Sequence, residues 1–311
     1  MFTGVFTAIV TPFKDGKVDE KTFKELIRFG IEQGVSGIVP CGTTGESPTL
    51  SHDEHKRVVE LTVSEVSGQV KVIAGTGSNS TEEAIDLTQH AKSVGADAVL
   101  LVSPYYNKPT QEGLYQHFKK IAEVVDIPII LYNIAGRTAV NIENATVKRL
   151  SEIPNIVGVK EASGNILQMS EVIRLCGPDF DVLSGDDQMT FPLMALGGKG
   201  VISVVSNIIP NKMCSLVRLM LEGKVAEARA IHFEIYELCQ AMFIETNPIP
   251  VKAVLGLMGK LTPEYRLPLC PPAEANLEKL KGILDKYGLL EDVPRKAASK
   301  RRPSKAKQPK N

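Results

Sequence analysis

Eight short runs rich in valine, isoleucine and leucine recur along the first two thirds of the chain, and stretches with helical spacing of apolar residues separate them. The runs are residues 4–10, 37–40, 70–74, 98–102, 128–132, 156–160, 181–184 and 200–204. Short apolar runs are typical of parallel strands that are buried on both faces. Eight such strands alternating with helices predict an α/β protein built on a closed (β/α)8 barrel, the TIM barrel.

The main alternative is an open, doubly wound sheet, which would favour a phosphate-binding turn directly after its first strand. Here the first run leads into Thr-Pro-Phe-Lys-Asp-Gly at 11–16, which has no such turn. The glycine-rich segment 75–80 ends in Ser80, where a dinucleotide-binding fingerprint has its third glycine. The closed barrel is therefore the favoured fold.

Capping residues stand where the first helices are expected to begin. Asp19, Ser51 and Ser80 each precede a stretch with helical periodicity. Glu54 and Glu83 follow the two serines at the spacing of a capping box, in which serine and glutamate side chains satisfy each other's backbone N–H groups. These patterns predict helices that start at fixed points after the strands.

The pattern becomes wholly helical after about residue 206, with expected helices at 211–221, 225–242, 249–258 and 273–287. The first of these is expected to close the barrel and the others to form an appendage. We therefore expect a barrel over residues 1–224, a C-terminal helical domain over 225–290 and a basic disordered tail over 291–311.

The formal net charge of zero hides an asymmetry along the chain. Of 36 basic residues, eight follow Pro294 with no acidic residue among them, which leaves residues 1–294 with 28 basic and 36 acidic residues and a net charge of −8. An acidic body gives no reason to expect a nucleic-acid partner. The tail could attract polyanions only weakly.

Several features suggest a cytoplasmic protein. No apolar run reaches the roughly 18 residues that could span a membrane, and no basic stretch precedes an apolar segment at the start of the chain. The five cysteines are widely spread and include no C-x-x-C pair. That pattern fits reduced thiols and supports neither a disulfide framework nor a zinc site.

Polar residues at the carboxyl ends of the expected strands are the candidates for chemistry, because barrel enzymes build their sites there. Lys160 ends the sixth run, where partial desolvation favours the neutral amine that attacks a carbonyl and forms a Schiff base. Two other readings remain open at this point. The side chain could extend into the following loop, or it could form an ion pair with Glu161.

Other strand ends supply hydroxyls and a guanidinium. Tyr132 could transfer a proton through a second hydroxyl. Thr43 and Thr44 lie in a glycine-flanked turn that could bind an anion. Arg137 has the geometry to bind a carboxylate. A structural turn and an exposed loop arginine are the competing interpretations.

Two possible metal sites are weak. Asp186 and Asp187 are adjacent but lack a further ligand at a suitable spacing. His52 and His55 share a helical face without an evident third ligand. We expect no metal.

Five motifs, in this order, resemble those of the 4-hydroxy-tetrahydrodipicolinate synthase family, also called dihydrodipicolinate synthases, within the class I pyruvate aldolase/lyase superfamily. The motifs are Gly42-Thr43-Thr44-Gly45-Glu46-Ser47, Pro104-Tyr105-Tyr106-Asn107, Tyr132-Asn133, Arg137-Thr138 and Val159-Lys160-Glu161-Ala162-Ser163-Gly164. The resemblance runs from residue 2 to residue 290 and does not include the tail.

This resemblance implies a barrel with a C-terminal helical domain that condenses pyruvate with L-aspartate 4-semialdehyde in diaminopimelate and lysine biosynthesis. It implies that Lys160 forms the Schiff base with pyruvate and that Tyr132 is the central proton donor and acceptor. Thr43 would link Tyr132 to Tyr106, which in the family reaches into the neighbouring subunit's site. No metal or organic cofactor is implied.

The resemblance also implies the substrate contacts. Thr44 would bind the pyruvate carboxylate, Arg137 would bind the carboxylate of the semialdehyde, and Gly185 and Ile202 would line the pocket. Ala135 stands where the family usually has proline, which would stiffen the loop by fixing φ. We expect the loop that carries Arg137 to be more mobile as a result.

By the same resemblance, L-lysine is a possible inhibitor that binds at a subunit interface of a homotetramer built as a dimer of dimers. The implied lysine-binding residues are Ser47, Pro48, His52, His55, Asn79, Glu83 and Tyr105. A sister pyruvate-dependent aldolase, such as N-acetylneuraminate lyase or a 2-keto-3-deoxy-sugar-acid aldolase, is the alternative function. It would not need both Tyr106 and Arg137. A catalytically silent binding protein is a second alternative.

Overall fold

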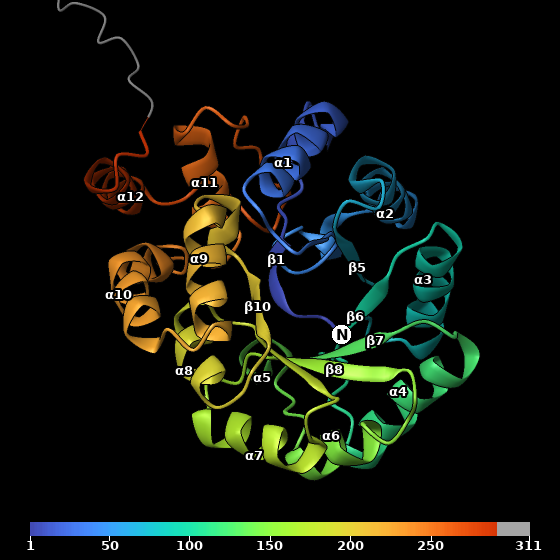
Figure 1. The fold of residues 1–311 in the computed structure, drawn as a ribbon. Helices are drawn as coiled ribbons and strands as arrows, with labels where there is room; N and C mark the ends of the chain where they lie inside the picture. Colours follow the sequence, from blue (N-terminus) through green and yellow to red (C-terminus); the bar gives the residue numbers. More distant parts are fainter. Residues whose placement is uncertain (291–311) are drawn as a thin grey trace, which may run out of the picture.

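In the computed structural model, which describes residues 1–290, eight parallel strands form a closed barrel inside a ring of helices (Figure 1). The strands are β1 (Gly4–Ala8), β4 (Gly37–Val39), β5 (Lys71–Gly75), β6 (Ala98–Val102), β7 (Ile129–Asn133), β8 (Ile156–Glu161), β9 (Asp181–Ser184) and β10 (Gly200–Ser203). They follow one another in chain order, and β10 pairs with β1. The predicted barrel is confirmed, and the bounds of each expected run differ from those of its strand by two residues or fewer.

Helices cover the outside of the barrel, and all but the last follow one strand and precede the next. They are α1 (Glu20–Glu32), α2 (His52–Val66), α3 (Thr81–Ser93), α4 (Gln111–Val124), α6 (Asn144–Leu150), α7 (Ile166–Cys176), α8 (Thr190–Ala195) and α9 (Pro210–Leu221). Short elements follow several strands: the hairpin of β2 (Phe13–Lys14) and β3 (Lys17–Val18), α5 (Ala135–Thr138), and three 3-10 helices, η1 (Ser47–Thr49), η2 (Asp187–Met189) and η3 (Val205–Asn207). The sequence pattern did not predict these short elements.

The predicted caps set the starts of the first two long helices. Asp19 accepts a hydrogen bond from the amide of Thr22 at 3.1 Å at the start of α1. At the start of α2, the Ser51 hydroxyl accepts from the amide of Glu54 at 3.2 Å, and the Glu54 carboxylate accepts from the amide of Ser51 at 3.0 Å. The complete capping box fixes where the chain leaves the turn after β4.

The inside of the barrel is filled with side chains. Phe2, Phe6, Ile130, Leu183 and other apolar residues form one buried cluster there. The rings of Phe2 and Phe6 lie 6.2 Å apart between centroids. A second, larger cluster lies between the barrel and its helices. The barrel is therefore a packed core that supports the strand ends rather than a pore.

The C-terminal part consists of α10 (Val225–Ala241), α11 (Ile249–Leu257) and α12 (Glu274–Lys286). Figure 1 shows these helices, in orange to red, together on one side of the barrel. Helix α10 packs against α8 and α9, and α12 packs against α10 and α11. The expected C-terminal helices are confirmed, whereas the domain boundary after residue 224 stays a prediction and the tail, 291–311, lies outside the described residues. None of the helices between residues 1 and 290 is long and apolar enough to span a membrane.

The closure of the barrel depends on two glycines. Gly4 of β1 pairs with Gly200 of β10, and their φ angles of +114° and +146° disfavour any other residue. A Cβ atom at Gly200 would lie 1.9 Å from the carbonyl oxygen of Gly4. Only glycine allows the first and last strands to approach this closely.

We therefore expect Gly200→Ala to lower the free energy of unfolding by about 1–3 kcal/mol or more, because the added methyl group forces the two strands apart. Urea unfolding followed by circular dichroism would measure the change. Gly282→Ala in α12 is the control, since nothing lies within 4 Å of the position of its Cβ atom. That variant should gain about 0.5–1 kcal/mol from lower backbone entropy in the unfolded chain. Unchanged unfolding of Gly200→Ala would show that the closure tolerates a side chain.

Candidate active site

Neighbouring strands bring Lys160 and Tyr132 together. In the parallel register of β7 and β8, Tyr132 pairs with Lys160 and Asn133 pairs with Glu161. Lys160 is 6% exposed, and its Nζ lies 4.0 Å from the centroid of the Tyr132 ring. A strand alternates its side chains between two faces, so these two side chains share the inner face of the barrel. The amine of Lys160 therefore lies beside the ring of Tyr132 inside the barrel, near the carboxyl ends of β7 and β8.

Glu161 does not pair with Lys160. Its carboxylate accepts hydrogen bonds from the Asn133 side-chain amide at 3.1 Å and from the backbone amide of Ser163 at 2.7 Å. Gln168 of α7 donates a further hydrogen bond at 3.3 Å. Among the residues that the structure describes, no ion pair includes Lys160. Of the readings that the sequence left open, the ion pair with Glu161 is excluded.

Gly185 shapes the space around the lysine, and Ile202 lies in the interior of the barrel. A Cβ atom at Gly185 would lie 3.0 Å from Cε of Lys160 and 2.6 Å from Cβ of Ala162. The lack of a side chain at this position leaves room for the lysine stem. Ile202 of β10 is buried in the same interior cluster as Tyr132.

The turn after β4 places its two threonines differently. Thr43 lines a cavity at the carboxyl ends of the strands, whereas Thr44 is buried and accepts a hydrogen bond on Oγ1 from the side-chain amide of Asn247 at 2.9 Å. The hydroxyl of Thr11 donates to the carbonyl of Gly45 at 2.7 Å and holds the turn against the end of β1. The backbone of this turn is fixed from two sides.

Asn247 is a residue of the site that sequence reasoning missed. It lies between α10 and α11 in the C-terminal part, and its carbonyl oxygen accepts a hydrogen bond from Nη2 of Arg137 at 3.1 Å. It thus contacts both Thr44 and Arg137, which are 203 and 110 residues away. No local pattern around an asparagine before a proline could have indicated such distant partners.

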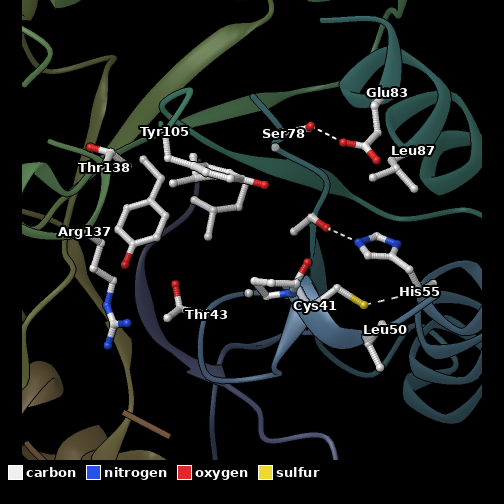
Figure 2. Close-up of a pocket in the computed structure, with 18 of the residues that line it drawn as sticks. Cys41, Thr43, Leu50, His55, Ser78, Glu83, Leu87, Tyr105, Arg137 and Thr138 are labelled. Carbon is white, nitrogen blue, oxygen red and sulfur yellow. Dashed lines mark hydrogen bonds between the residues drawn. The ribbon is translucent and has the colours of Figure 1, made fainter. Parts of the chain in front are cut away.

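A cavity of about 410 Å³ is lined by residues from both the predicted catalytic and the predicted regulatory sets, whereas Lys160, Thr44, Gly185 and Ile202 are not among its lining residues. Figure 2 shows Thr43 and Arg137 on one side of it and His55 and Glu83 on the other. The lining residues from both predicted sets are Thr43, Tyr132, Arg137, Ser47, Pro48, His52, His55, Glu83 and Tyr105. Asn79 lies beside the cavity, where its side chain donates to the carbonyl of Tyr105 at 3.1 Å.

Glu83 does not complete the capping box that its spacing predicts. The Ser80 hydroxyl accepts from the amide of Glu83 at 3.4 Å, but the Glu83 carboxylate turns to His52, at 2.6 Å, and to the hydroxyl of Ser78. The hydrogen bond from Ser78, opposed by partial burial and reinforced by His52, holds the pKa of Glu83 below its usual range. The prediction of a full box at Ser80 is wrong, because the carboxylate is directed into the cavity wall.

His55 presents an unpaired acceptor in the cavity region. Its Nε2 lies 2.8 Å from the carbonyl oxygen of Gly75, which can only accept, so Nε2 carries the proton. Burial lowers the pKa of His55 to about 4. The neutral ring leaves the buried Nδ1 with no hydrogen-bond partner within the described chain.

Tyr106 lies apart from this group. Its side chain is 90% exposed, its φ angle is +70°, and it does not line the cavity. A positive φ is strained for a bulky residue. Within one chain, the structure therefore does not bring Tyr106 to Thr43 and Tyr132.

Comparisons with known proteins agree with this geometry. Residues 1–287 match the Dihydrodipicolinate synthetase family. The 4-hydroxy-tetrahydrodipicolinate synthase of Syntrophus aciditrophicus is 60% identical over 290 residues, which cover 93% of this chain and 100% of that protein.

Two solved structures extend the comparison. The chloride-inhibited dihydrodipicolinate synthase of Acinetobacter baumannii, complexed with pyruvate, has a TM-score of 0.92 at 47% identity and covers 93% of this chain and 100% of its own. The enzyme of Cyanidioschyzon merolae with lysine bound has a TM-score of 0.90 at 43% identity and covers 93% and 99%. With its lysine and tyrosine at adjoining strand ends and a family match over almost the whole described chain, this protein belongs to the dihydrodipicolinate synthetase family.

Proposed function

We propose that this chain is a 4-hydroxy-tetrahydrodipicolinate synthase that condenses pyruvate with L-aspartate 4-semialdehyde in lysine biosynthesis. The observation that carries the proposal is the buried amine of Lys160 above the ring of Tyr132, next to a cavity that Thr43 and Arg137 line. Family membership and the name of the Syntrophus relative favour this reaction over those of the sister aldolases. We further infer that the enzyme acts in the cytoplasm.

Lys160 starts the reaction as a nucleophile. Its neutral amine attacks the ketone carbon of pyruvate, and loss of water leaves a protonated imine. This cation withdraws electrons from the neighbouring methyl group, which loses a proton and forms an enamine. The enamine carbon then attacks the aldehyde of the second substrate. The chemistry needs neither a metal nor an organic cofactor.

Tyr132 is the proton donor and acceptor in these steps. Its ring lies against the lysine amine, and Thr43 lines the same cavity. A proton that leaves the methyl group, or one that is needed by the alkoxide of the new bond, can pass along these hydroxyls. The relay is completed by Tyr106 from a second subunit.

Thr44 and Arg137 bind the two carboxylates. Because the Thr44 oxygen already accepts a hydrogen bond from Asn247, its hydroxyl proton is free to point at the carboxylate of pyruvate. Arg137 uses one N–H of Nη2 for the carbonyl of Asn247, and its other N–H groups are available for the carboxylate of the semialdehyde. Gly185 and Ile202 bound the space around the bound pyruvate.

The enzyme works as a homotetramer, a dimer of dimers. One contact surface surrounds Tyr106, whose exposed ring has no role within its own chain. A second surface contains the exposed side chains of Leu167 on α7, Leu196 after α8 and Phe233 on α10. Helix α8 contacts both α7 and α10, so these apolar side chains lie on adjoining helices that a second dimer can cover.

L-lysine inhibits by binding at the regulatory end of the cavity. Glu83 can pair with an ammonium group, His55 lines the wall near it, and Tyr105 and Asn79 contact the carboxylate. Ser47, Pro48 and His52 complete the wall. Because Thr43 lines the same cavity, lysine and the proton relay are coupled, and pyruvate must affect lysine binding to the same degree that lysine affects pyruvate binding.

Lys160→Ala is expected to abolish the pyruvate adduct that borohydride traps, because within residues 1–290 the one other buried lysine, Lys252, is paired with Glu46. Mass spectrometry of peptides after reduction measures the adduct. Lys71→Ala, which removes an exposed lysine paired with Asp97, should retain a full yield. An adduct of full yield at another lysine in Lys160→Ala would overturn the assignment.

Tyr106→Phe is expected to lower kcat by about a hundredfold, because the ring stays and only the proton path is lost. Steady-state kinetics measures the loss, and sedimentation shows that the assembly is intact. Refolding this variant together with Lys160→Ala should restore part of the activity, since mixed dimers contain one site with both groups. An unchanged kcat would mean that the hydroxyl has no part in proton transfer, and no recovery would mean that Tyr106 does not cross between subunits.

L-lysine is expected to give partial inhibition that Glu83→Ala weakens by about tenfold or more, because the variant loses the carboxylate that pairs with the ammonium group. Kinetics and calorimetry measure inhibition and binding. Glu82→Ala, in the same first turn of α3, is the matched control and should not change either. Full activity with no heat of binding at saturating lysine would refute the regulatory site.

A further inference from the structure

A fully buried ion pair joins the C-terminal part to the turn after β4, residues 42–46, which contains Thr43 and Thr44 and is called the threonine turn below. Glu46 is the first residue after Gly45, and Lys252 lies in α11. The Lys252 Nζ is 2.5 Å from Oε1 of Glu46, and both side chains are 0% exposed. Among the ion pairs of residues 1–290, this is the one in which neither side chain contacts solvent.

The surroundings of Lys252 hold its ammonium group in one place. Nζ donates a second hydrogen bond to the carbonyl of Glu264 at 2.6 Å and lies over the rings of Phe13, at 4.3 Å, and Tyr265, at 5.3 Å. Burial lowers the pKa of Lys252, and Glu46 opposes that shift. These contacts hold the ammonium group in one position. The Glu46 carboxylate that it binds is therefore held in one position as well.

Stability alone is a poor explanation of this pair. Removing two charges from water is costly, and replacing a buried ion pair with apolar groups of similar volume is often neutral or stabilising. What such a pair gives is a defined position for the backbone that carries it. That backbone here is the turn with Thr43 and Thr44.

The conformation of the turn needs such a fixed point. Glu46 has φ +54° and ψ +36°, the left-handed region that a residue with a side chain seldom adopts. The strain persists only where the surroundings hold it. Gly45, one residue earlier, is held on the other side by the hydroxyl of Thr11. Anchoring the Glu46 side chain therefore sets the path of the two residues just before Gly45.

We propose that Glu46 and Lys252 are positioning residues that hold Thr43 and Thr44 in place for pyruvate. This role rests on the proposed function, in which these threonines bind pyruvate and relay its proton. The C-terminal part then contributes to the site twice, through Asn247 on the Thr44 hydroxyl and through Lys252 on the turn itself.

The test is the double variant Glu46→Gln/Lys252→Met, which removes both charges and keeps side chains of similar length. The control is Glu20→Gln/Arg57→Met, which removes an exposed ion pair of 2.8 Å between α1 and α2. Before the variants are compared, borohydride trapping shows whether the wild-type protein binds pyruvate covalently. Thermal unfolding then establishes that each variant is folded. If the wild-type protein traps no pyruvate, the proposed function is wrong, and the positioning role that rests on it is wrong as well.

A positioning role predicts a kinetic pattern. The double variant should show kcat/KM for pyruvate about 10- to 100-fold lower, because small displacements of positioned groups are costly to catalysis. The KM for the semialdehyde should stay within about twofold, because Arg137 lies in α5 and not in the turn after β4. The control variant should match the wild type in both. A folded double variant with wild-type constants for pyruvate would overturn the proposal.

If the double variant does not fold, hydrogen exchange of the wild-type protein with and without pyruvate tests the positioning role instead. Pyruvate should slow exchange in peptides from 41–50 and from 249–266 together, because the pair couples the two segments, and it should not change exchange in α12. Slowing that is confined to 41–50 would show that the turn is ordered without Lys252, and it would contradict the proposal.

Discussion

The in-register pairing of β7 with β8 is the constraint on which the rest of the site depends. It places Tyr132 beside Lys160 on the inner face and Asn133 beside Glu161 on the outer face. Because side chains alternate along a strand, a slip of one residue would exchange the lysine for a carboxylate. On the outer face, the hydrogen bond from the Asn133 side-chain amide to Glu161 would be lost by such a slip and therefore opposes it. Structural and chemical requirements therefore fix the same register.

The sequence was sufficient to predict what repeats along the chain or depends on near neighbours. Eight apolar runs predicted eight strands and their closure, and the spacing of Ser51 and Glu54 predicted the cap of α2, because these signals are local. The position of Lys160 at a strand end indicated the chemistry proposed for it, and the family resemblance added the roles proposed for its companions. The structure then showed that Glu161, its neighbour in sequence, belongs to the opposite face.

What the sequence could not predict depends on contacts between distant segments or between chains. Asn247 and Lys252 reach the threonine turn from more than 200 residues away, and no periodicity records such contacts. Glu83 has the spacing of a capping residue, yet its carboxylate bonds to His52 and Ser78 and not to the backbone amide of Ser80. Tyr106 is 90% exposed within one chain, and its proposed partners belong to a second subunit, so neither the sequence pattern nor a single chain contains those contacts.

Under the proposed regulation by L-lysine, the shared cavity has a consequence for how this enzyme can evolve. Thr43 and Arg137 bound one end and His55 and Glu83 the other, with no wall assigned to one function alone. A substitution that widens the effector end also changes the solvation and shape of the space in which the substrates meet. Sensitivity to the end product and fit to the substrates therefore cannot drift independently. Lineages that lose feedback should carry compensating changes at the opposite end of the same cavity.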